Sequence, residues 1–557
     1  MDLPQKKKNI VIIGGGVIGS TTAYYLTRHP KFNPSLHSIT LLEATSIAAG
    51  ASGKSGGLLA LWAYPECLVP LSYRLHRELA EQYGGDQKWG YRQVKCGTIG
   101  AVVKNTDLGA SKAAKENAQA KTPAAAPGMS ALQATEIESS HNSVETSAIQ
   151  TSEATAAAPL PGTRFVPDTD AQATSPKPQP ETSNIVGAHT NGTTPQFTQS
   201  SFAPIPGSAP TLERASISSV SDRDKTVEER VDDTNHIGSS ETKLENNKKE
   251  WEKLPKQDTA ATSLLGASTL PADLDWIESE FIQYYEEMGR TGFTETAQVH
   301  PLHFTTAIAE LARSAGVDFR TGAKVTNFTT SCSTSPDLKV VEYVDRNNGD
   351  AINSIGGVTD VIVTAGPWTG KLLPRSKIEG LRAHSVVYEA DVSPYAVFTD
   401  IQLPGDYVPQ HRARAGQKRK HRGNVDPEVY ARPFGEVYAC GEPDKDIPLP
   451  DTADQVQTDQ GQCDDLTAYL GTISPVLAAA PVKAKQACYI PQHIRFGKER
   501  GALIGPTATP GIWIAAGHTC WGIQNGPATG FLMAEFIFDG EAKAAEIDTL
   551  HPAKFKV

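Results

Sequence analysis

The feature that most constrains the fold is a glycine-rich stretch near the start of the chain, where residues 9–19 read NIVIIGGGVIG. Its apolar, mostly β-branched residues are typical of a buried parallel strand, and Gly14, Gly16 and Gly19 complete the spacing G-x-G-x-x-G as the pattern becomes helical. We expect Gly14 to make the turn, Gly16 to let the backbone approach a pyrophosphate, and Gly19 to let the helix pack against the sheet. The stretch therefore predicts a strand, a tight turn and a helix whose N-terminus receives phosphates.

A second predicted strand supports this interpretation. Residues 38–42 read SITLL and are followed by Glu43. A carboxylate at that point can accept hydrogen bonds from both ribose hydroxyls of an adenosine, and it would repel a 2′-phosphate. The alternative is a plain glycine turn before a helix, with no ligand.

The composition and charge of the chain indicate which kind of ligand or partner it binds. The chain has 557 residues, enough for several domains, and a formal net charge of -11. This balance argues against a nucleic-acid surface, which normally needs a basic excess, so a small molecule is the expected partner. The seven cysteines contain no C-x-x-C pair, and their odd number suggests free thiols in a reducing, intracellular compartment. No apolar run reaches the roughly 18 residues of a membrane span, and no metal site is expected.

Residues 105–262 differ from the rest of the chain. They are rich in Ala, Ser, Thr, Pro, Asn and charge, and they contain none of the tyrosines. Such a segment cannot bury enough apolar surface to offset its ordering entropy, so we expect a disordered insertion. Its Ser and Thr residues could be phosphorylation or protein-partner sites, and the alternative is a tolerated expansion of a surface loop.

Other stretches suggest further parts of a ligand site. Residues 51–59 form a loop of small residues with one cation, suited to phosphate or a flavin edge, or else simply flexible. Residues 360–368 form an apolar strand that ends in small residues, where ligands bind in a doubly wound sheet. Residues 511–530 repeat the opening plan before a helix expected at 531–538.

The middle of the chain predicts a second sheet. Residues 380–399 and 428–440 alternate in the manner of antiparallel strands. Between them, residues 412–422 form a basic loop, which we interpret as solvated, with a nuclear signal or an anionic-lipid patch as alternatives. Residues 440–465 are Asp- and Gln-rich and are expected to be another surface excursion.

Several motifs together resemble a known family. The glycine turn with Glu43, GKSGG at 53–57, VHP at 299–301, VTAGPW at 363–368, YARP at 430–433 and AGH at 516–518 resemble, in this order, the FAD-dependent D-amino-acid oxidase-like family (DAO). The sequence is most similar to a fungal branch of uncharacterised oxidoreductases, generally assigned to the cytoplasm and in part to endosomes. The resemblance implies hydride transfer from a carbon bearing an amine to flavin, which oxygen or another acceptor reoxidises.

The resemblance also implies the architecture: an α/β, Rossmann-like FAD-binding domain made of discontinuous segments, with an α+β substrate domain built on a mixed or antiparallel sheet. On this basis residues 1–104 hold the first FAD-binding segment and the start of the substrate domain, and 105–262 are the insertion. Residues 263–380 hold substrate-domain helices and an FAD-binding segment, 381–490 the substrate-domain sheet with its basic and acidic loops, and 491–557 the C-terminal FAD-binding segment.

The family's motifs carry over onto particular residues of this chain. The adenosine end falls to Gly14, Gly16, Gly19, Glu43 and Val325. The flavin-ring end falls to Ser52, Lys54, Gly57, Leu58, Ala365, Gly366, Gly517, His518 and Gly522. Flanking members of the same motifs complete the expected cofactor site: Val17, Ile18, Ala44, Gly53, Trp368 and Ile523.

One departure concerns the substrate. Many family members carry an arginine before a proline in the strand preceding the last block, where it clamps a substrate carboxylate, but residues 486–491 read QACYIP here. Arg432 and Arg495 are the available substitutes, and Arg432 could equally form a structural ion pair. The cysteine in that strand, Cys488, matches the position of a covalent flavin link in sarcosine and fructosyl-amine oxidases, or it is a buried structural cysteine.

Two functions follow as hypotheses. The first is an FAD-dependent oxidoreductase acting on a small amine or an amino-acid-like carbon–nitrogen bond. The second is a flavin-containing regulatory or endosomal trafficking factor whose oxidase site is vestigial and whose insertion does the work.

Overall fold

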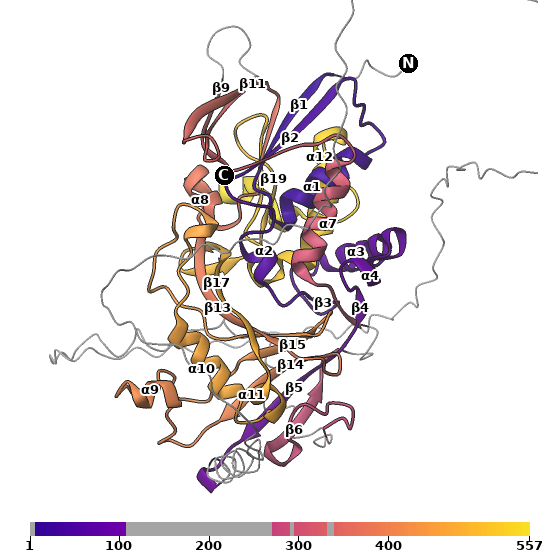
Figure 1. Ribbon diagram of the computed structural model, residues 1–557. Coiled ribbons are helices and arrows are strands. Elements are labelled where there is room, and N and C mark those ends of the chain that lie inside the picture. The colour runs from indigo at the N-terminus through magenta and orange to yellow at the C-terminus, as the bar shows by residue number, and fades with distance from the viewer. Residues whose placement is uncertain (1–5, 107, 109–269, 290–294, 331–338) are drawn as a thin grey trace, which may run out of the picture. The chain divides into compact units, whose positions relative to one another are not determined.

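Two large sheets organise the described part of the chain, which in this computed structural model comprises residues 6–106, 108, 270–289, 295–330 and 339–557 (Figure 1). All of these residues belong to one structural unit, formed by residues 1–124 and 243–557. The expected insertion, 105–262, lies outside the described residues apart from 105, 106 and 108. No helix in the described ranges is long and apolar enough to cross a membrane.

The first sheet is the predicted doubly wound sheet. Its order is β19-β20-β12-β1-β2-β8, and all neighbours are parallel except β19 and β20. The strands are β1 (Lys8–Ile13), β2 (His37–Glu43), β8 (Asp318–Thr321), β12 (Asp360–Val363), β19 (Leu503–Pro506) and β20 (Ile512–Ala516).

The two faces of this sheet have different covers. Ile10 and Ile12 of β1 pack among residues of the helices α1 (Val17–Arg28), α7 (Pro301–Arg313) and α12 (Gly522–Asp539). Val11 and Ile13 point to the opposite face, as strand alternation requires, and pack against a three-stranded sheet. The strands of that smaller sheet are β9 (Ala323–Thr330), β10 (Lys339–Asp345) and β11 (Ala351–Val358). Burial on both faces explains why β1 reads as a continuous apolar run.

The second sheet is mixed and mostly antiparallel, as the sequence predicts, with the order β18-β17-β13-β16-β15-β14-β5-β6 and one parallel pair, β14 with β5. Its strands are β5 (Lys95–Val102), β6 (Ile282–Glu287), β13 (Ile378–Glu389), β14 (Tyr395–Gln402), β15 (Glu428–Arg432), β16 (Glu436–Cys440), β17 (Val482–Arg495) and β18 (Lys498–Arg500). The helices α10 (Gln460–Leu470) and α11 (Pro475–Ala479) contribute to the core on one side of it. Two expected domain boundaries, at 380/381 and 490/491, fall inside β13 and β17.

The remaining elements are a small sheet and several further helices. A small sheet joins β3 (Leu58–Ala60), β7 (Thr296–Gln298) and β4 (Arg92–Gln93). The short helices are α2 (Ala51–Lys54), α4 (Gly85–Lys88), α8 (Thr369–Leu372) and α9 (Gln410–Arg414). The longer α3 (Val69–Tyr83) buries Leu71, Leu75 and Leu79, the face that its apolar spacing predicts.

Three sequence expectations need correction. Residues 51–59 are not simply a loop, because they contain α2 and β3. Residues 440–465 are not a surface excursion throughout, since Cys463 and Asp465 are fully buried. The basic loop is not entirely solvated: the Arg412 guanidinium binds the buried Asp465 carboxylate through two hydrogen bonds, of 2.6 and 2.5 Å.

The last helix also begins earlier than expected. α12 starts at Gly522, not at 531, although the intervening residues include glycines and Pro527. A Cβ on Gly526 would lie 2.7 Å from Val17 Cγ2, and one on Gly530 would lie 2.5 Å from the Thr21 carbonyl carbon. These glycines are therefore contact points between α12 and α1, and tertiary packing overrides their low helix propensity.

Candidate functional site

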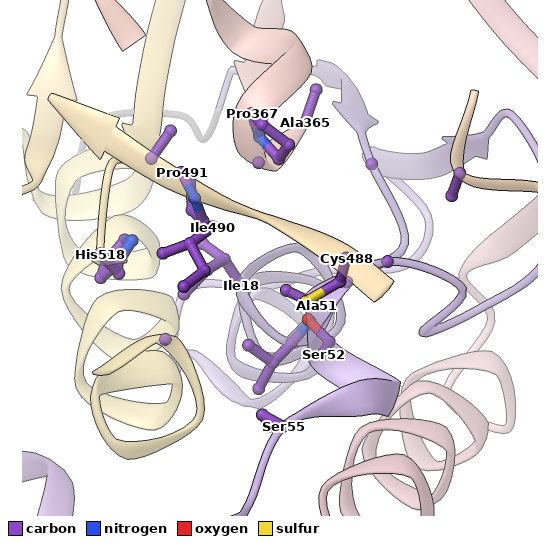
Figure 2. Close-up of a pocket in the computed structure, with 18 of the residues that line it drawn as sticks. Ile18, Ala51, Ser52, Ser55, Ala365, Pro367, Cys488, Ile490, Pro491 and His518 are labelled. Atoms are coloured by element: carbon purple, nitrogen blue, oxygen red, sulfur yellow. The ribbon is translucent and has the colours of Figure 1, made fainter. Parts of the chain in front are cut away.

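A cavity of about 400 Å³ lies where the carboxyl ends of the first-sheet strands meet the second sheet. Figure 2 shows residues from both parts around it, including Ile18, Ser52 and Ala365 from the N-terminal and middle segments, and Cys488 and His518 from the C-terminal half. We call the part at Gly14, Gly16, Glu43 and Ala44 the nucleotide end, and the part at Glu428, Tyr430, Tyr438 and Trp521 the second-sheet end.

The glycine turn at the nucleotide end has no room for side chains at two of its positions. Gly14 has φ +110°, and a Cβ there would lie 2.6 Å from the carbonyl oxygen of Thr364. A Cβ on Gly19 would lie 1.9 Å from the carbonyl oxygen of Gly14. Gly16 is the N-cap of α1 and has no side chain, and the Val17 N–H in the first turn donates a 2.9 Å hydrogen bond to the Ser52 hydroxyl. The turn thus presents backbone and a helix N-terminus to the cavity, which suits an anion.

Glu43 fixes this turn from β2. Its Oε2 accepts a 2.7 Å hydrogen bond from the Gly15 backbone N–H, and its Oε1 accepts from both the N–H and the hydroxyl of Thr45 at 2.9 Å. The carboxylate also lines the cavity. Glu43 therefore holds the glycine turn in place at the wall of the cavity.

Most of the predicted cofactor residues line this one cavity. They are Gly14, Gly16, Val17, Ile18, Glu43, Ala44, Ser52, Gly57, Leu58, Val325, Ala365, Gly366, Trp368, Cys488, Gly517, His518, Gly522 and Ile523. Gly19, Gly53 and Lys54 do not line it. Gly19 serves packing, as expected, and Lys54 is engaged elsewhere, because its Nζ donates a 3.0 Å hydrogen bond to the carbonyl oxygen of Ala487.

The C-terminal block presents a turn of a different kind. Gly517 has φ +89° and is followed by His518 and a 3₁₀ turn, Thr519–Trp521, before α12 begins. The His518 Nε2 lies 2.9 Å from the hydroxyl of Thr529. Burial lowers the pKa of His518 to about 4, so this imidazole is neutral near pH 7. It can thus donate or accept a hydrogen bond but does not supply positive charge.

Ser55 Oγ and Trp521 Nε1 belong to residues that line the cavity, and they are among the buried polar atoms that have no hydrogen-bond partner in the described part of the chain. Buried polar atoms are usually satisfied, because an unmade hydrogen bond costs about 1–3 kcal/mol. The two atoms therefore point to a polar ligand, and together with the glycine turn they fit a dinucleotide.

Cys488 lies on β17 and lines the cavity (Figure 2). Burial raises the pKa of its thiol to about 11, and the positive charge of Lys54 only partly offsets this. A covalent flavin link requires a thiolate, so the surroundings oppose that chemistry although the position allows it.

The two candidate substrate arginines do not line the cavity. Arg432 Nη2 lies 2.8 Å from His300 Nε2 and 3.5 Å from Glu436 Oε2, an arrangement that matches the structural alternative. Arg495 Nε donates a 3.2 Å hydrogen bond to His493 Nε2, and its Nη2 donates to the carbonyl oxygen of Arg375.

Sequence reasoning missed most of the second-sheet end. The residues are Tyr64, Glu428, Tyr438, Cys440, Glu499, Cys520 and Trp521. Pro443 and residues 451–453 of the expected surface excursion also line the cavity, where Asp451 pairs with Lys324. One signal was present: Glu428 precedes Tyr430 by two residues, so strand alternation puts both on the same face.

The fold and the cavity define a dinucleotide-binding protein with a second sheet closing the site. The chain belongs to the DAO family of FAD dependent oxidoreductases, whose family model matches residues 9–160 and 216–536.

Relatives and solved structures agree with this assignment. The chain is 34% identical over 577 residues to the proposed oxidoreductase TDA3 of Saccharomyces cerevisiae, an alignment that covers 98% of this chain and 94% of TDA3. It is 26% identical to a proposed oxidoreductase of Schizosaccharomyces pombe, with 98% of both chains covered. Glycine oxidase from Geobacillus kaustophilus has a TM-score of 0.51 at 13% identity, with 98% of each chain covered. L-proline dehydrogenase from P. horikoshii has a TM-score of 0.51 at 12% identity, covering 100% of this chain and 99% of that one. These two structures show a shared fold.

Proposed function

We propose that this protein binds FAD and oxidises a carbon–nitrogen bond of a small amine or amino-acid-like substrate. The observation that carries the proposal is the single cavity, which runs from the glycine turn and Glu43 to a tyrosine-lined face of the second sheet. A cofactor bound at the first end would thus have its reactive part near the second. The solved structures that share the fold include proteins named for oxidation of glycine and L-proline, which supports the same substrate class.

The residues at the cavity fit FAD. The backbone around Gly14 and Gly16 would approach the diphosphate, and Glu43 would face the ribose hydroxyls. Ser52, Gly57 and Gly517 would border the ring system, and Ser55 Oγ is free to hydrogen-bond a polar edge. When bound, FAD supplies the hydride acceptor, and the protein's share of the work is to bind and orient the reactants.

The second-sheet end can also keep water away from a substrate. Tyr430 and Tyr438 stack with ring centroids 5.9 Å apart, and Trp62 meets Trp521 edge to face at 5.7 Å. Phe398 joins these pairs, since its ring lies 5.8 Å from Tyr430 and 6.1 Å from Trp62. This aromatic floor gives an apolar surface on which a small substrate can be desolvated.

The test is reduction of the flavin. Purified protein is expected to be yellow, and a matching amine or amino acid should bleach its visible absorbance without oxygen. Free FAD mixed with the same compounds is the control. The electron acceptor is then identified by readmitting oxygen or adding a dye. Protein without flavin would contradict the cofactor assignment. Flavin that no member of a broad panel reduces would contradict the proposed reaction and favour the regulatory alternative.

A further inference from the structure

We propose that the substrate is a cationic amine without a carboxylate, and that Glu428 binds its ammonium group at the second-sheet end of the cavity. This inference rests on the proposed function and names the substrate class of the same site.

Glu428 is a carboxyl with free hydrogen-bonding capacity at the cavity. It begins β15, lines the cavity and is half-buried. Its Oε2 accepts a hydrogen bond from the hydroxyl of Tyr430 and lies 3.7 Å from Cys440 Sγ. Within the described part of the chain, Oε1 has no hydrogen-bond partner and no basic side chain pairs with the group. Burial raises the pKa of this carboxyl, because charge is costly to bury alone, and a cationic ligand beside it would stabilise the charged form.

The charged residues of the cavity are unevenly distributed. The basic side chains that line it are Lys324 and Lys371, and both pair with Asp451 at 3.0 Å. Lys324 belongs to the start of β9, next to Val325 of the predicted adenosine end. No arginine of the described residues lines the cavity. The second-sheet end thus carries carboxyl groups without a basic counterpart.

A second acidic side chain lies at the same cavity. Glu499 of β18 lines the cavity, and it accepts a 3.2 Å hydrogen bond from the Gln492 amide. Glu428 and Glu499 are thus acidic side chains of the cavity wall with no basic partner among the described residues, and neither offers the positive charge that a substrate carboxylate needs.

The aromatic side chains favour the same ligand. Tyr430 beside Glu428, and Trp521 with Tyr64 at 5.9 Å between ring centroids, are aromatic rings of the cavity wall, and such rings bind cations well. Trp521 is 5% exposed and lines the cavity.

Pairs of compounds, each an amino acid and the amine that lacks its carboxylate, test this inference directly. FAD-loaded protein is titrated without oxygen with phenethylamine and with phenylalanine, and with pyrrolidine and proline, and perturbation of the flavin spectrum reports binding whether or not reduction follows. We expect each amine to bind at least about 10-fold more tightly than its amino acid, since a hydrogen bond to a charged group is worth about 10- to 100-fold. Equal or tighter binding of the amino acids would overturn the proposal, as would no binding by any amine.

Substitution assigns the effect to Glu428. Glu428→Gln keeps the shape and can still accept from Tyr430, and it should weaken phenethylamine binding about 10- to 100-fold while leaving the neutral phenethyl alcohol unchanged. Glu389→Gln, at the exposed end of β13, is the matched control and should change neither. If Glu428→Gln loses FAD, Glu428→Asp replaces it, with weaker amine binding at normal flavin content expected. Unchanged amine affinity in the flavin-loaded variant would overturn the role of Glu428. Lack of flavin in the wild type would instead contradict the proposed function.

Discussion

The two ends of the cavity differ in whether backbone atoms or side chains form them. The nucleotide end consists of backbone and glycine, with Gly14 and Gly19 leaving no room for a Cβ and Glu43 tying down the turn. The second-sheet end consists of side chains on strands distant in sequence, such as Glu428 and Tyr438. A site formed by backbone atoms tolerates few substitutions, because ligand binding there depends directly on the path of the backbone. A side-chain site can change its ligand by single substitutions while the fold stays intact.

This difference predicts where mutations abolish flavin binding and where they alter only the chemistry. Four experiments examine it, in order of decreasing effect.

The largest effect is expected for Gly14→Ala. The new Cβ would lie 2.6 Å from the Thr364 oxygen in a backbone with φ +110°, so FAD binding should fall more than about 100-fold. Gly349→Ala is the matched control, because Gly349 also has positive φ, +59°, but a Cβ there would have no other atom within 4 Å. Flavin content per protein measures both. Equal flavin content in the two variants would contradict the role of the turn.

Glu43→Gln should have the next largest effect. The amide cannot accept with the strength of the carboxylate that now binds Gly15 N–H and Thr45, so FAD affinity should fall about 10- to 100-fold. Titration of apoprotein with FAD, followed by quenching of flavin fluorescence, gives the dissociation constant. Glu389→Gln again serves as the control. An unchanged constant for Glu43→Gln would show that this carboxylate is not part of the nucleotide end.

Glu499→Gln tests the second-sheet end of the cavity by its effect on the free energy of unfolding. Burial raises the pKa of Glu499 to about 7, so the folded protein holds a proton that the unfolded chain releases near pH 4.5. Its favourable contribution is complete below about pH 4.5 and is lost as the pH rises through about 7. The group is partly exposed, so we expect the variant to be more stable than wild type by only about 1 kcal/mol at pH 8, with no difference at pH 4.5.

Urea unfolding of flavin-loaded protein at the two pH values measures this difference. Glu389→Gln should show none. A variant that is less stable than wild type at pH 8 would contradict the expected sign.

The smallest effect is expected at Cys488. Because burial raises the pKa of the thiol to about 11, little thiolate is present near neutrality and no covalent link to flavin should form. Acid precipitation should leave all the yellow colour in the supernatant for wild type and for Cys488→Ser alike. Colour that remains in the wild-type pellet and disappears in the variant would establish the link.

Strand and helix periodicity, and with it much of the fold, could be read from the sequence. The apolar run before Gly14 and the spacing of Leu71, Leu75 and Leu79 are local patterns, and they correspond to β1 and to the buried face of α3. The start of α12 could not be predicted, because the reason for Gly526 and Gly530 in a helix is contact with Val17 and Thr21, far away in sequence.

The sequence by itself determined the nucleotide end, because a glycine fingerprint encodes backbone geometry over a few consecutive residues. Only the tertiary structure decided the second-sheet end. Alternation places Glu428, Tyr430 and Arg432 on one strand face, but it does not say that the first two line a cavity while Arg432 is held by His300 and Glu436. That outcome depends on how β15 pairs with β16 and on what α7 brings beside it. The pairing of β15 with β16 is local, but His300, the N-cap of α7, lies 132 positions from Arg432 in the sequence, and no local pattern records that contact.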